Sequence, residues 1–87
     1  MKIKWFAPLD KMFGSVSEFL LTEPTPLPRV LRQLTEQEPA FAPYARFEEG
    51  DRQAHGLLVC RRGLVLSLAD ELHPDDELEM VVMVTGG

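Results

Sequence analysis

The order of apolar and polar residues predicts an alternating strand at the start of the chain. Across residues 2–7, one face carries Ile3, Trp5 and Ala7 and the other carries Lys2, Lys4 and Phe6. A period of two residues is typical of a strand with one buried face. A second apolar segment covers residues 16–22, after a break marked by Pro8 and Gly14. The two segments predict an opening hairpin.

A helical period replaces the strand period after this hairpin. Apolar residues recur three and four positions apart, at Leu27, Val30, Leu31 and Leu34. This spacing predicts a helix of about three turns with one buried stripe. We expect Thr25 to cap its first turn and Pro39 to end it.

The next segment, residues 40–56, has no clear period. It is long for a connection in a compact domain. Its aromatic residues are expected to attach it to the core through one short turn, and they are Phe41, Tyr44 and Phe47.

Strands return in the last third of the chain. Residues 57–61 and 64–68 are apolar and flank Arg62-Gly63, which is typical of a tight hairpin turn. An acidic loop then leads to a final strand at 78–84, apolar on both faces as in a central strand. The order predicts an α+β fold, a β-grasp roll of about five strands in a mixed sheet on one main helix. The last strand is expected beside the first, in parallel. We expect this domain to cover residues 1–85, followed by a flexible tail of Gly86 and Gly87.

Composition narrows the partners and the compartment. The net charge of −5, with scattered basic residues, argues against nucleic acid as a partner. The chain has one cysteine, Cys60, so it forms no internal disulfide. We find no signal-peptide pattern and no apolar run near the ~20 residues of a membrane helix. We therefore expect a cytoplasmic protein that does not contact membranes.

The side chains show no pattern of a self-contained enzyme. Cys60 lies in a predicted strand, as an apolar filler would. His55 and His73 are separated in loops, which argues against a metal site. The acidic pairs at 48–49 and 75–76 are typical of solvated turns. We expect the chain to bind no cofactor and no metal itself.

The terminal glycines point to a different kind of chemistry. Gly86 and Gly87 directly follow the last predicted strand. The whole chain resembles the small subunit of molybdopterin synthase and, more broadly, the MoaD/ThiS sulfur carriers and ubiquitin-like proteins. The resemblance rests on the segments IKWFA, LDKMFG, LPRVLRQL, LLVCRRGLVLS, LHPDDELEMVV and the terminal VTGG.

This resemblance implies that the chain is a protein co-substrate and that its partners perform the catalysis. An E1-like enzyme of the MoeB/ThiF type would use ATP to adenylate the carboxylate of Gly87. A sulfur donor would then convert it to a thiocarboxylate. In the larger, MoaE-type subunit, this sulfur would build the dithiolene of molybdopterin, which holds molybdenum or tungsten. Gly86 and Gly87 suit this role, since glycine allows another backbone to approach closely.

Partner docking is expected on the exposed sheet face. Alternation places Phe6, Val81, Met83 and Thr85 opposite the predicted core, and Leu64 or Leu66 is expected to join them. An apolar patch of this kind is typical of a partner site.

Three other functions remain open. The chain is also compatible with a ubiquitin-like protein modifier that is joined to lysines through Gly87. It is compatible with a sulfur carrier for thiamine, cysteine or a natural product. The third alternative is a plain β-grasp binding module with incidental glycines.

Overall fold

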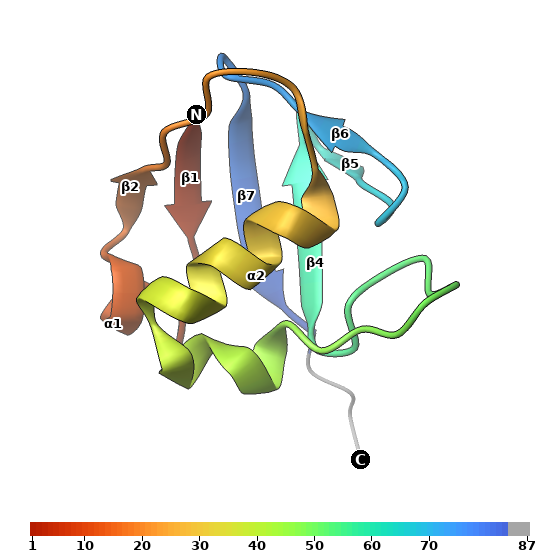
Figure 1. Ribbon diagram of the computed structural model, residues 1–87. Helices are drawn as coiled ribbons and strands as arrows, with labels where there is room; N and C mark the ends of the chain where they lie inside the picture. The colour runs from red at the N-terminus through yellow and green to blue at the C-terminus, as the bar shows by residue number, and fades with distance from the viewer. Residues whose placement is uncertain (84–87) are drawn as a thin grey trace.

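A five-stranded mixed sheet forms the frame of the molecule (Figure 1). The computed structural model describes residues 1–83. The strand order is β2-β1-β7-β4-β5. Their bounds are β1 Lys2–Trp5, β2 Val16–Glu18, β4 Leu57–Arg61, β5 Leu64–Val65 and β7 Glu77–Val82. The predicted opening hairpin is confirmed, because β1 and β2 pair antiparallel.

The first and last strands lie side by side in parallel, as predicted. Ile3 is opposite Leu78 and Trp5 is opposite Met80, and all four side chains are buried. The other neighbour of β7 is β4, which runs antiparallel to it. The C-terminal strand therefore occupies the middle of the sheet, and the core lies on one face of it.

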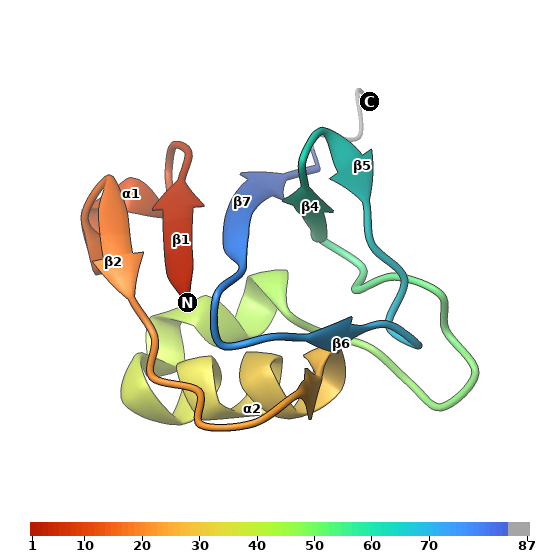
Figure 2. The ribbon, with the colours of Figure 1, turned by 90° about the horizontal axis from the view of Figure 1, so that it is seen from above.

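The helix α2, Leu27–Gln37, covers that face of the sheet (Figure 2). The four residues of the predicted stripe are all buried. The predicted cap is wrong, because Pro26 precedes the helix and the Thr25 hydroxyl donates to the Glu23 carbonyl at 2.9 Å. Thr25 lies instead in a short strand.

The 40–56 connection begins with a 3₁₀ helix, η1 Pro39–Tyr44. Phe41 is fully buried, and Tyr44 and Phe47 pack against the core, as predicted. Phe41 meets the rings of Trp5 and Phe13 edge-on, at centroid distances of 5.7 and 5.4 Å. Phe13 ends the short helix α1, Asp10–Phe13, which replaces the first predicted break.

Several predicted boundaries differ from the structure. The acidic loop contains a strand, β6 Glu71–Leu72, which pairs with β3 Thr25–Pro26 in a second small sheet. The second predicted strand ends at Glu18, after which Phe19 is buried and Leu20 is 86% exposed. Ala7 is exposed, since β1 ends two residues before it.

Within residues 1–83, no helix has the length and apolar character needed to cross a membrane. The predicted boundary between domain and tail, after residue 85, lies outside the described residues.

Candidate functional site

The end of β7 is held in place by the chain beside it. Leu57 of β4 is opposite Val82. One step further on, the Met83 backbone N–H donates to the Gly56 carbonyl at 3.0 Å. The backbone leading to the terminal glycines is therefore fixed up to Met83. The predicted site residues Thr85, Gly86 and Gly87 lie outside the described residues.

Glycine at position 56 allows a close contact between two backbone segments. A Cβ atom at this position would lie 3.3 Å from the Tyr44 Cα and 3.4 Å from the Tyr44 carbonyl oxygen. Tyr44 ends η1, which is packed on the core. The contact thus connects Gly56, and through its hydrogen bond also Met83, to the core through backbone atoms.

Two further contacts lie within the 40–56 connection. The His55 backbone N–H donates to the Arg46 carbonyl at 2.7 Å, and the His55 ring lies 2.8 Å from the Asp51 carboxylate. A hydrogen bond from the Glu48 backbone N–H, followed by the His55 contact, lowers the pKa of Asp51. These bonds brace the segment that supports Met83.

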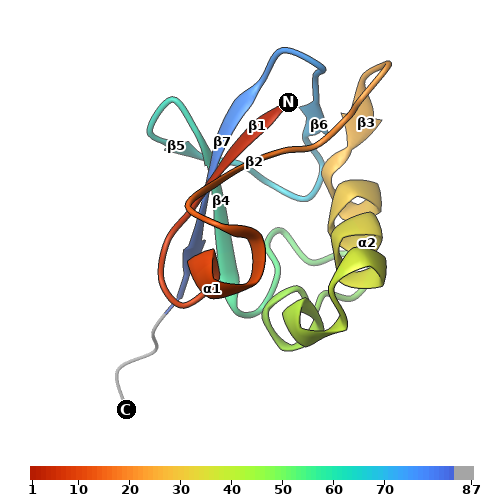
Figure 3. The same cartoon turned by 90° about the vertical axis from the view of Figure 1, so that its left-hand side faces the viewer.

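The sheet face opposite α2 carries no other described element (Figure 3); we call it the open face. Phe6, predicted for this face, is 37% exposed. The Phe6 backbone N–H donates to the Met80 carbonyl at 3.2 Å, which places Phe6 next to Val81 of β7. Val81 and Met83 are half-buried. The structure therefore brings Phe6 and Val81 together where β7 ends.

The two leucines predicted to extend this patch do not lie on it. Leu66 is buried, and its N–H donates to the Val59 carbonyl at 2.7 Å. Leu64 is 72% exposed but is opposite Arg61, on the other face of the hairpin from Cys60. The residue on the open face is Val65, which is opposite Cys60.

The hairpin turn determines which face of the sheet these two leucines occupy. Arg62 and Gly63 both have positive φ, 54° and 77°, as in a two-residue hairpin turn that fixes the register of its strands. Counting outward from this turn pairs residue 61 with 64 and residue 60 with 65. The sequence already contained that information, because the turn itself was predicted.

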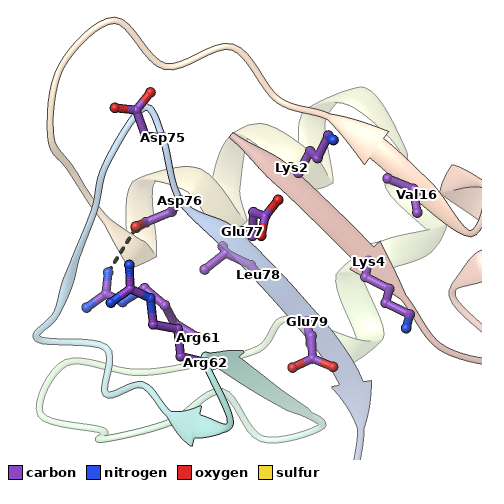
Figure 4. A pocket seen from close by; sticks show the side chains of 10 residues that line it. All are labelled: Lys2, Lys4, Val16, Arg61, Arg62, Asp75, Asp76, Glu77, Leu78 and Glu79. Atoms are coloured by element: carbon purple, nitrogen blue, oxygen red, sulfur yellow. Dashed lines mark hydrogen bonds and ion pairs between the residues drawn. The ribbon is translucent and has the colours of Figure 1, made fainter.

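The opposite end of the open face is charged and hollow (Figure 4). The hollow has a volume of about 480 Å³. Lys2 and Lys4 line it on β1, and Glu77 and Glu79 line it on β7. Arg61 and Arg62 close it on the β4 side, with Asp75 and Asp76 above the start of β7.

One ion pair fixes the rim of this hollow. Arg61 donates to the Asp76 carboxylate at 2.9 Å, and the same oxygen accepts the His73 backbone N–H at 2.9 Å. Burial acts to raise the pKa of Asp76, but these two hydrogen bonds and the nearby positive charge, chiefly that of Arg61, together outweigh it and hold the pKa below its ordinary value. The turn at residues 73–76, which precedes β7, is thus bonded to Arg61 at the end of β4.

The residues with possible catalytic chemistry are not grouped. Cys60 is partly exposed, and burial followed by the nearby Glu79 charge raises the pKa of its thiol. A raised pKa disfavours the reactive thiolate. Among residues 1–83, no three His, Cys, Asp or Glu side chains are arranged to hold a metal ion.

The fold of the chain is similar to that of a solved structure. No family model and no curated protein matches the chain. The crystal structure of SAMP1 from Haloferax volcanii is similar to it, with a TM-score of 0.75 and 24% sequence identity. The alignment covers 100% of this chain and 98% of that one. The chain has a ubiquitin-like β-grasp fold.

Proposed function

We propose that this protein is a ubiquitin-like sulfur carrier that acts through the carboxylate of Gly87. The observation that carries the proposal is the placement of the last strand. The central strand β7 leads the backbone to Met83, where Gly56 holds it four residues before the chain ends. A folded domain whose last described strand is followed in the sequence by two glycines suits delivery of one carbonyl group to successive partners.

The chemistry requires an activating partner. The Gly87 carboxylate attacks the α-phosphorus of ATP, and pyrophosphate leaves. A hydrosulfide equivalent from a sulfur donor then attacks the acyl-adenylate carbon, and AMP leaves, which yields a thiocarboxylate. A bare glycine end assists both steps because no side chain obstructs the carbonyl.

The position of the apolar patch supports docking at the open face. Four extended residues span at most about 14 Å. An enzyme that reacts with Gly87 must therefore contact the molecule close to Met83. Phe6 and Val81 lie at this end of the open face, and exposed apolar side chains of this kind favour protein contact.

Within this class, we propose the small subunit of molybdopterin synthase as the specific role. The support is the resemblance of the segments named above, including the acidic turn, the last strand and the terminal VTGG. The partners are then an E1-like enzyme of the MoeB/ThiF type, a sulfur donor and a larger MoaE-type subunit. The chain itself would bind no cofactor, and ATP would be bound by the activating enzyme.

A protein modifier is the second candidate, favoured by one comparison. SAMP1 is a ubiquitin-like small archaeal modifier protein. Both functions begin with adenylation and differ in the group that attacks next, which is sulfur for a carrier and a lysine amine for a modifier. Lysine-linked conjugates that require Gly87 would identify the modifier.

The intact mass of the protein tests the proposal. The full chain is incubated with an E1-like enzyme, ATP and a sulfur donor. We expect a mass gain equal to the exchange of one oxygen for one sulfur, and no gain when Gly86 and Gly87 are deleted. The absence of any gain with several competent activating enzymes would refute the carrier function.

A further inference from the structure

The charged half of the open face leaves its opposite charges unpaired. Lys2 is next to Glu77 and Lys4 is next to Glu79 in the register of β1 and β7. Among residues 1–83, none of these four side chains forms an ion pair within 4.0 Å. The Lys4 ammonium lies 5.3 Å from the Phe6 ring centre instead. A column of cations thus runs beside a column of carboxylates (Figure 4).

The charges of the two columns are complementary to those of a second copy of the same face. Two copies can meet through their open faces, related by a two-fold axis that runs parallel to the strands between β1 and β7. This rotation places β1 of one copy over β7 of the other, and each residue keeps its position along the strand direction. Because the register is Lys2 with Glu77 and Lys4 with Glu79, each lysine of one copy then faces the equivalent glutamate of the other. A two-fold interface requires this kind of self-complementarity.

The outer strands match under the same axis. The axis brings β2 of one copy over β4 of the other, because each of these strands adjoins one of the central pair. Glu18 lies at the height of Lys2, and Arg62 lines the β4 side of the hollow, so these opposite charges also meet. At the other end of the sheet, Phe6 faces Val81 of the second copy.

We propose that the open face binds a second copy of this chain, two-fold, with the β1 lysines of each copy on the β7 glutamates of the other. The long side chains of one copy fill the hollow of about 480 Å³ in the other. The proposal goes beyond the proposed function and has a consequence for it. The dimer covers Phe6 and Val81, so self-association and docking of an activating enzyme exclude each other.

Charge reversal with complementation tests this interface. Sedimentation equilibrium of the full chain over a concentration series gives the dimer dissociation constant. We expect K4E and E79K each to raise this constant at least about tenfold, since each places like charges at two symmetric contacts. An equimolar mixture of K4E and E79K restores the dimer, because the reversed charges of the two variants face each other.

Mixing the two variants distinguishes contacts between two copies from contacts within one copy. Lys4 and Glu79 are neighbours within the chain, but only a contact between copies is restored by mixing two different variants. E79K also lowers the net negative charge, so its effect cannot come from overall repulsion. K11E changes an exposed lysine on α1, outside this face, and leaves the dissociation constant unchanged. Circular dichroism of each variant verifies the fold.

Three results would overturn the inference. They are a monomeric wild type at every concentration, a dimer that K4E and E79K leave intact, and a mixture that stays monomeric. The mass measurement is independent of these results. A protein that dimerises as expected but takes up no sulfur refutes the proposed function alone, and a monomer that takes up sulfur overturns the dimer alone.

Discussion

At the scale of single residues, Gly56 and Asp76 connect the sheet to the two segments that flank β7. Gly56 binds Met83 at the end of the strand, and Asp76 binds Arg61 before its start. Neither role could be predicted from sequence. The Tyr44 backbone approaches Gly56 only once η1 is packed, and Arg61 and Asp76 are fifteen positions apart in the chain.

We expect Gly56→Ala to weaken the hydrogen bond that holds Met83 to residue 56. The added Cβ would press on Tyr44 backbone atoms at 3.3–3.4 Å, so the backbone at position 56 or at Tyr44 must shift by a few tenths of an ångström. We expect this shift to strain the hydrogen bond from the Met83 N–H to the carbonyl of residue 56. The free energy of unfolding should fall by about 1–2 kcal/mol. Hydrogen exchange of the Met83 amide should accelerate beyond this global loss.

Gly63→Ala is the matched control for this prediction. Its φ of 77° makes alanine strained, but a Cβ there meets no atom within 4 Å. It should lower stability without a selective effect on the Met83 amide. Equal protection of that amide in both variants would contradict the role of Gly56.

We expect Asp76→Asn to destabilise the protein by about 1 kcal/mol at neutral pH, since an uncharged amide weakens the bonds to Arg61 and His73. The folded-state pKa of Asp76 is depressed, so its contribution is fully present above the ordinary value of 3.8. It is lost as the pH falls through the lower folded-state pKa. Denaturation at several pH values should therefore show the difference between variant and wild type shrinking in acid.

Asp75→Asn controls for the removal of a charge from the same turn. Asp75 is exposed, and its side chain forms no hydrogen bond or ion pair with the described residues. A constant loss for Asp76→Asn from neutral pH to below 3.8 would refute the assignment to its carboxylate.

At the scale of elements, periodic segments were predicted well and elements defined by pairing were not. The α2 stripe and the alternation of β1 follow from local spacing, because each element buries one face. The strands β3 and β6 contain two residues each and exist only through their mutual pairing. The positions of Leu64 and Leu66 were wrong because the register set by the Arg62-Gly63 turn was not carried into β5.

The aromatic cluster gives a prediction at this scale. Phe41 of η1 contacts both Trp5 of β1 and Phe13 of α1, whose rings stack at 4.1 Å. We expect Phe41→Ala to lower the free energy of unfolding by about 3–5 kcal/mol. Phe41→Leu should cost less, since it keeps most of the buried volume.

Denaturant unfolding followed by the fluorescence of Trp5, the sole tryptophan, measures both effects. Tyr44→Ala is the control, since Tyr44 packs against the core but is only half-buried. A loss for Phe41→Ala no larger than that for Tyr44→Ala would show that η1 is not anchored through Phe41.

At the scale of the whole molecule, fold and proposed chemistry occupy separate parts of the chain. Within residues 1–83, the last buried core residue is Met80, with Val82 packed against the core, whereas the reacting carbon would be that of Gly87. The β-grasp fold was predictable because its order of elements is visible in the pattern. The function rests on two glycines whose meaning comes from their position after that fold.

This separation predicts that the terminal residue can be changed with an effect on rate alone. Gly87→Ala keeps the carboxylate but adds a methyl group beside the reacting carbonyl. We expect its rate of sulfur uptake with the activating enzyme to fall about tenfold or more, equivalent to about 1.4 kcal/mol in the barrier. The melting temperature should not change, because every core residue in the described part of the chain precedes position 87. Gly63→Ala, a glycine-to-alanine change in the β4–β5 turn, should give the opposite result, with lower stability and normal uptake. If Gly87→Ala took up sulfur at the wild-type rate, close approach would not be the reason for glycine at this position, and the carrier function would then require only the carboxylate.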